Sequence, residues 1–208
     1  EKNRKDMGKI QFLFMWISGW CTACLLCLYQ PFMKIWMGEE MMLPFYLVIM
    51  LAAYFYILKM SDIRTMYSES AGIWWQARYI SVAEAVSNLV LNWILVKYLG
   101  LFGIILATMI SYFVFNFIGG AIILFRYYFT EGGFWQYIAT NMWYALVTAV
   151  VSFVTYWCTT YVTFEGILGL ILKMVICIIV PNVLFLLLYC RTREFKDCFT
   201  WVRKKMKK

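Results

Sequence analysis

Long runs of apolar residues, separated by short polar joints, fill most of the chain. A helix needs about 20 mostly apolar residues to cross the hydrocarbon core of a bilayer, and six stretches are long enough. These stretches are residues 10–36, 42–66, 79–98, 101–125, 135–161 and 167–189. The pattern predicts an all-α integral membrane protein, in which residues 1–208 form one bundle of six transmembrane helices.

The composition indicates that lipid surrounds most of the apolar surface of the chain. Hydrophobic residues make up 64% of the 208 residues and charged residues only 14%, far from the balance of a soluble domain. A net charge of +8 suggests nucleic acid as a partner in a soluble protein. Here the basic residues lie in loops and tails, as they do on the cytoplasmic side of membrane proteins. We therefore expect the lipid bilayer as a partner, and no nucleic acid.

The distribution of Lys and Arg predicts an orientation. Six spans put both tails, and the loops after the second and fourth spans, on one side of the membrane. Sixteen of the 19 Lys and Arg residues lie on that side, against Lys34 and Lys97 on the other, while Lys173 lies within the sixth span. This asymmetry predicts that both termini are cytoplasmic.

The two ends of the chain add two expectations. The chain begins with Glu1 and has no signal peptide, so we expect a fragment or a processed chain. The basic tail, residues 191–208, has aromatic residues between its Lys and Arg residues. This tail is predicted to be either a short amphipathic segment on the anionic inner leaflet or a plain stop that fixes the topology.

Two of the predicted spans carry a stripe of polar residues. In the third span, Ser81, Glu84, Asn88 and Asn92 are spaced three or four residues apart, so they share one helix face. They form either one wall of a polar path through the membrane or hydrogen bonds to a neighbouring helix. The fifth span repeats the spacing with uncharged residues, which either line a cavity or pack helices closely. These residues are Asn141, Tyr144, Thr148, Ser152, Thr155 and Thr159.

Charged residues at other depths complete the candidate site. Lys173 either snorkels to the outer surface or lines a central cavity, where it attracts an anionic group such as a phosphate. Lys59, Asp62 and Arg64 crowd near the inner end of the second span, either as a solvated helix end with mutual ion pairs or as a gate. The candidates for a substrate or ion pathway are Arg64, Glu84, Asn88, Asn92, Asn116 and Lys173. The candidates for its cytoplasmic mouth are Lys59, Asp62 and Arg78.

Catalysis is not expected from this set of residues. The chain has no histidine, no G-x-S-x-G motif and no pair of carboxylates within one span. Cys21, Cys24 and Cys27 have a metal-like spacing, but they lie in the first apolar span, where cysteine behaves as a small hydrophobic residue. We therefore expect no metal, no cofactor and no enzymatic activity.

The run from Tyr67 to Ser111 resembles the second-half signature of bacterial polysaccharide flippases of the Wzx type. These O-antigen and capsule flippases belong to the multidrug/oligosaccharidyl-lipid/polysaccharide exporter superfamily. The resemblance lies in the loop from Gly72 to Trp75 with Arg78, the helix with Glu84, Asn88 and Asn92, the turn from Lys97 to Gly100, Gly103, and the pair Ala107 and Thr108. The segment from Pro31 to Glu40 is also similar to the end of the helix that precedes this signature.

This resemblance implies a larger, two-lobed transporter, of which the chain supplies most of the C-terminal lobe. The missing N-terminal lobe then precedes Glu1 in the same polypeptide. Such proteins flip a lipid-linked oligosaccharide from the inner to the outer leaflet of the bacterial cytoplasmic (inner) membrane by alternating access. Two alternatives stay open: a multidrug exporter of the same superfamily, and a membrane scaffold or accessory subunit that transports nothing.

Overall fold

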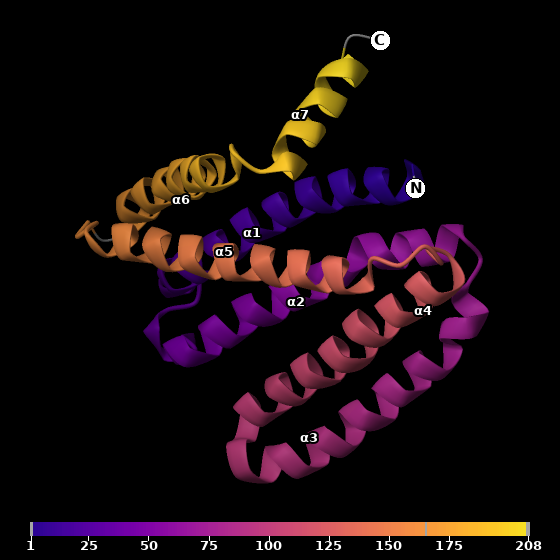
Figure 1. Ribbon diagram of the computed structural model, residues 1–208. Coiled ribbons are helices and arrows are strands. Elements are labelled where there is room, and N and C mark those ends of the chain that lie inside the picture. Colours follow the sequence, from indigo (N-terminus) through magenta and orange to yellow (C-terminus); the bar gives the residue numbers. More distant parts are fainter. Residues whose placement is uncertain (1, 165, 207–208) are drawn as a thin grey trace. The chain divides into compact units, whose positions relative to one another are not determined.

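The structure is a computed structural model that describes residues 2–164 and 166–206, and in this part of the chain all regular secondary structure is helical, without strands (Figure 1). Its elements in chain order are α1 (Lys2–Trp36), the short η1 (Glu39–Met41), α2 (Phe45–Ser70), α3 (Trp74–Ser111), the π-helical η2 (Tyr112–Gly119), α4 (Gly120–Tyr127), α5 (Phe134–Thr160), α6 (Gly166–Tyr189) and α7 (Arg193–Met206).

Five helices in the described residues are long and apolar enough to cross a membrane, which is typical of a multi-pass membrane protein. The predicted count of six is therefore not confirmed. The difference lies in the third of these helices, which runs for 54 residues from Trp74 to Tyr127 and includes both the third and the fourth predicted spans. Within it, Gly100 has a non-helical backbone conformation, and the chain folds back on itself there.

The helix boundaries follow the apolar runs to within a few residues, with two informative differences. α1 begins at Lys2, because its polar first turns are rich in Lys and Arg, which are good helix formers. α2 begins at Phe45, directly after Pro44, which cannot donate a backbone hydrogen bond. In both cases the hydrophobic run and the helix begin at different residues. The start of the run depends on which side chains prefer lipid to water, whereas the start of the helix depends on the conformation and hydrogen bonding of the backbone.

The chain divides into two compact units. The first consists of residues 2–7 and 53–142, and its core contains Met60, Phe117 and Leu124. In it, Tyr137 at the start of α5 stacks at a tilt on Phe117, with 5.9 Å between ring centroids. The loop after α4 is held by the first turn of α1, because Arg4 donates a hydrogen bond to the carbonyl of Gly132 at 2.8 Å.

The second unit consists of residues 8–52 and 143–206, apart from residue 165. In it, α1 and α6 pack antiparallel, because Trp16 donates to the side chain of Asn182 and Trp20 donates to the carbonyl of Cys177. Phe185, Tyr144 and Tyr189 are among the large side chains buried in this unit, and Phe185 is only 1% exposed. Aromatic packing and indole hydrogen bonds therefore hold α6 against α1.

Candidate functional site

The candidate site lies in a hairpin that α3 forms with η2 and α4, side by side in Figure 1. At the reversal, Gly100 has a φ of 55°, a left-handed conformation that glycine adopts without strain. The two arms then approach closely, since a Cβ atom added to Gly103 would collide with the backbone of Leu95. Gly103, Ala107 and Ser111 are all buried, as expected for small residues spaced four apart at a helix contact.

A chain of hydrogen bonds, which we call the relay, joins three segments of the first unit. The guanidinium of Arg64 on α2 donates through Nη2 to Oδ1 of Asn116 on η2, at 2.5 Å. The amide of Asn116 donates through Nδ2 to Oε2 of Glu84 on α3, at 3.2 Å. The relay thus connects a cation to a carboxylate through one neutral amide.

The chemistry of Arg64 and Glu84 fixes the orientation of the Asn116 side-chain amide between them. A guanidinium only donates hydrogen bonds and a carboxylate only accepts them, so the amide of Asn116 has one orientation that satisfies both. Arg64 is only 5% exposed, and its Nε has no hydrogen-bond partner in the described part of the chain. A buried cation of this kind is costly unless it is paired, and Glu84 supplies the compensating charge at a distance.

Two glycines make room for this arrangement. A Cβ atom added to Gly120 would collide with the guanidinium of Arg64, so the cation lies directly against the backbone of α4. A Cβ atom added to Gly119 would lie 3.1 Å from a methyl group of Ile80. Asn116 itself lies in η2, and π-helical segments are frequent at functional sites.

A second set of hydrogen bonds lies further along the same stripe of α3. Asn92 donates to Oδ1 of Asn88 at 2.8 Å, and Asn88 donates to the hydroxyl of Ser111 at 3.0 Å. Both bonds run inside the hairpin, and the opposite face of α3 is apolar and open, with Leu89 71% exposed. Ser81, the first residue of the predicted stripe, is exposed as well.

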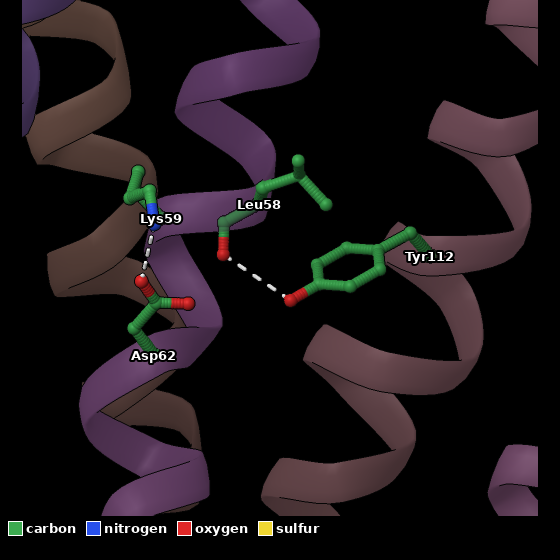
Figure 2. Close-up of polar contacts among 4 residues, drawn as sticks. All are labelled: Leu58, Lys59, Asp62 and Tyr112. Carbon is green, nitrogen blue, oxygen red and sulfur yellow. Dashed lines mark hydrogen bonds and ion pairs between the residues drawn. The ribbon is translucent and has the colours of Figure 1, made fainter.

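The residues of the predicted mouth separate into two groups. Lys59 and Asp62 form an ion pair at 2.8 Å within α2, and both side chains are about one third exposed. Figure 2 shows this pair beside the contact in which the hydroxyl of Tyr112 donates to the carbonyl of Leu58, at 3.2 Å. Arg64, two residues after Asp62 on α2, joins the relay.

Arg78 lies among aromatic rings at the start of α3. Its guanidinium is 3.8 Å from the ring centroid of Trp75 and 4.5 Å from that of Tyr79, whose hydroxyl accepts a hydrogen bond from it at 2.6 Å. Both rings are more than half exposed. Exposed Trp and Tyr residues beside a cation are typical of the headgroup level of a membrane.

Lys173 lies half-buried on α6 in the second unit, whereas the three residues of the relay belong to the first unit. The polar stripe of α5 is buried from Asn141 to Thr159. Two of its hydroxyls donate to carbonyls of the helix itself, that of Thr155 to Val151 and that of Thr159 to Tyr156, each at 2.7 Å. A Cβ atom added to Gly19 of α1 would come within 2.7 Å of Thr148. This geometry favours close helix packing over a cavity for the stripe of α5.

Sequence reasoning overlooked two residues that contact the site. Ser111 accepts the bond from Asn88, and the spacing of Gly103, Ala107 and Ser111 was a signal for it. Tyr137, whose hydroxyl lies 3.5 Å from the carbonyl of Met60, had no comparable signal. In the described residues no cluster of His, Cys, Asp or Glu side chains could hold a metal ion.

Comparison of the chain with protein-family models, with curated proteins and with solved structures found no match, so its function has to be inferred from the arrangement of these side chains.

Proposed function

We propose that this chain is the C-terminal part of a transporter that flips a lipid-linked oligosaccharide from the inner to the outer leaflet of the bacterial cytoplasmic membrane. The observation that carries the proposal is the relay from Arg64 through Asn116 to Glu84. Ionised side chains inside a membrane protein are expensive and usually mark a substrate or ion pathway. A scaffold that transports nothing has no need of them.

In this proposal the chain crosses the membrane six times, with both termini in the cytoplasm. The two arms of the hairpin that reverses at Gly100 count as separate crossings, since each is longer than the roughly 20 residues that a span requires. The sixteen Lys and Arg residues on one side support this orientation. The resemblance of the segment from Tyr67 to Ser111 to Wzx-type flippases supports an N-terminal lobe in the same polypeptide as the partner.

The proposed mechanism assigns one role to each end of the relay. The diphosphate headgroup of the lipid carrier is attracted to cationic groups, for which Arg64 and Lys173 are the candidates, while its hydrocarbon tail stays in the bilayer. Binding of a proton or another cation to Glu84 removes the charged acceptor from Asn116. Arg64 then loses its compensating charge and gains a preference for the phosphates, so ion binding and substrate binding are coupled.

The test uses the complete polypeptide in a bacterial host that makes the cognate glycan and lacks its own flippase. We expect wild-type protein to restore surface glycan, Arg64→Leu to abolish its export, and Glu84→Gln to reduce it at least tenfold. Lys97→Gln, a loss of charge at an exposed turn, serves as the matched control and leaves export unchanged.

Each of the other outcomes overturns one part of the proposal. Normal export by Glu84→Gln removes the coupling role of that carboxylate. Failure of the wild-type protein to restore glycan, together with resistance to amphipathic cationic dyes, indicates a multidrug exporter. Failure in both assays by a protein that is present in the membrane indicates a scaffold or accessory subunit.

A further inference from the structure

The first turn of α7 packs on α1 in the second unit. The hydroxyl of Thr192 accepts a hydrogen bond from the backbone N–H of Phe195 at 3.4 Å and so caps the start of the helix. The ring of Phe195 then stacks on Trp16, with 6.2 Å between centroids, and meets the edge of Phe12. Cys198, one turn later, is only 3% exposed.

The next turns of α7 are more exposed. Phe199 stacks on Phe195 at a centroid distance of 6.2 Å, yet 61% of Phe199 is exposed. Lys196 and Arg203 are exposed as well. The segment from residue 191 to residue 208 contains eight Lys and Arg residues against two acidic ones. An exposed aromatic ring is therefore continuous with the packed face of α7 and lies within a strongly basic segment.

We propose that α7 binds the surface of an anionic phospholipid membrane, with Phe199 inserted at the boundary between headgroups and acyl chains and Lys196 and Arg203 facing lipid phosphates. An apolar face beside a basic face is the pattern of helices that lie in a membrane interface. This inference concerns a lipid contact of the chain and is independent of the substrate that it transports.

The anchor point of α7 supports lipid as the occupant rather than another protein. Phe12 and Trp16, which hold Phe195, lie in the first turns of the apolar part of α1, where a span meets the headgroup region. From there α7 runs past Lys9, because Cys198 is close enough to that ammonium to interact with it. The exposed ring of Phe199 and its basic neighbours thus begin where a bilayer offers both an apolar phase and phosphate charges.

Charge complementarity identifies the kind of lipid. Each Lys or Arg residue near an anionic surface strengthens binding by roughly fivefold, and this contribution falls off within a Debye length of about 10 Å at 0.1 M salt. A neutral phosphatidylcholine surface gives only the smaller apolar contribution of Phe199. The binding of α7 is therefore expected to depend on anionic lipid and to weaken as salt is added.

The experiment measures backbone hydrogen exchange of α7 in the full chain, reconstituted into two kinds of vesicle. One kind contains phosphatidylcholine alone, and the other contains phosphatidylcholine with about one third phosphatidylglycerol. We expect the amides from Lys196 to Arg203 to exchange at least tenfold more slowly in the anionic vesicles, because surface binding suppresses local opening of the helix. Addition of 0.5 M KCl is expected to reverse most of this protection.

Two variants and one control assign the effect to named side chains. The double variant Lys196→Glu and Arg203→Glu is expected to lose the dependence on phosphatidylglycerol, and Phe199→Ser is expected to lower protection in both vesicles. The matched control is Lys97→Glu with Arg126→Glu, which reverses two exposed charges outside α7 and leaves the protection unchanged.

Alkylation of cysteines shows that the variants keep α7 on α1. Burial raises the pKa of the Cys198 thiol, so this buried residue is expected to react more slowly than the exposed Cys190 in every variant. Equal exchange of α7 in neutral and anionic vesicles overturns the proposal, whether the helix is protected in both by another protein surface or exposed in both. Unchanged lipid dependence in the double charge variant overturns it as well.

Discussion

α3 and α5 carry polar stripes with the same spacing and use them in opposite ways. On α3, Glu84 and Asn88 bond to residues of a different segment, Asn116 and Ser111. On α5, Thr155 bonds to a carbonyl of its own helix. The stripe of α3 therefore ties segments together, whereas the stripe of α5 offers its neighbours a surface of short side chains.

The reach of each side chain explains this difference. A Ser or Thr hydroxyl lies close to the carbonyl one turn earlier, so it can satisfy itself in its own helix and still be buried. An amide has more hydrogen-bonding groups, so a bond within its own helix, such as that from Asn141 to the carbonyl of Tyr137, leaves groups that need partners elsewhere. The carboxylate of Glu84 only accepts hydrogen bonds, so its donor has to come from another residue. Spacing identifies the inward face of a membrane helix, and the type of side chain decides whether that face bonds or only packs.

The largest effect is expected from removing the cation of the relay. Arg64→Leu leaves Glu84 without its compensating charge and Asn116 without its hydrogen-bond donor, and we expect a loss of about 3–5 kcal/mol in the free energy of unfolding in detergent. The double variant Arg64→Leu and Glu84→Leu removes both charges and is expected to recover most of that loss. An equally unstable double variant would show that the two charges do not compensate one another.

A smaller effect is expected from filling the space in which Arg64 lies. Gly120→Ala puts a methyl group against the guanidinium, and overpacking of this kind costs about 1–3 kcal/mol. Gly119→Ala is the matched control, because its nearest neighbour is the flexible end of Ile80 at 3.1 Å. Thermal unfolding of the two variants in one detergent compares them, and a control as unstable as Gly120→Ala would contradict the close approach of Arg64.

A smaller change in the free energy of unfolding is expected from single substitutions in the two polar stripes. Asn88→Leu breaks a bond between the arms of the hairpin and is expected to cost about 1 kcal/mol. Thr155→Val keeps the shape of a buried side chain and removes a bond within one helix, so we expect a change below about 0.5 kcal/mol. Equal costs, measured by unfolding in detergent, would remove the distinction between a bonding stripe and a packing stripe.

The smallest effect is expected from an ion pair outside both stripes, between Lys34 and Glu39 at 2.8 Å. Lys34 holds the pKa of Glu39 below its ordinary value of 4.5 through a hydrogen bond and its charge. Because the pKa is lowered in the folded state, the pair stabilises the protein above the ordinary pKa and is lost as the pH falls through the lowered one. The difference in melting temperature between wild type and Glu39→Gln is expected to be small at pH 7 and to decrease further as the pH falls through the lowered pKa of Glu39. A difference that grows at low pH would contradict this assignment.

Much of the fold could be predicted from hydrophobicity, because helices in lipid must be long, apolar and internally bonded. The turn near Gly100 could also be predicted, because a glycine lies there between two apolar runs. The number of crossings was not confirmed, because helix length and composition do not distinguish one bent helix of 54 residues from two shorter ones. The first turns of α1, which are polar, were predicted as a tail and form part of the helix instead.

The partners in the candidate site could not be predicted from spacing. The pattern put Glu84 on an inward face and named Arg64 and Asn116 as candidates, but it joined Arg64 to Lys59 and Asp62. Contacts between segments depend on how the hairpin packs on α2, and this packing depends on small residues such as Gly120. Lys173 was predicted to share a pathway with Glu84, and that prediction remains untested, because the two residues belong to different compact units.

The π-helical geometry of η2 gives the relay a mechanical property. The backbone N–H of Gly120 lies within hydrogen-bond distance of the carbonyls of both Phe115 and Asn116. The end of η2 therefore has both a π-helical bond, to the fifth residue before Gly120, and an α-helical bond, to the fourth. A change from one pattern to the other shifts the register by one residue, and each residue of an α-helix corresponds to a rotation of about 100°. Such a shift would turn Asn116 away from Arg64 and Glu84 while α2 and α3 stay straight. The relay that connects Arg64 to Glu84 would then open by a local twist of one segment, without moving a whole helix through the lipid.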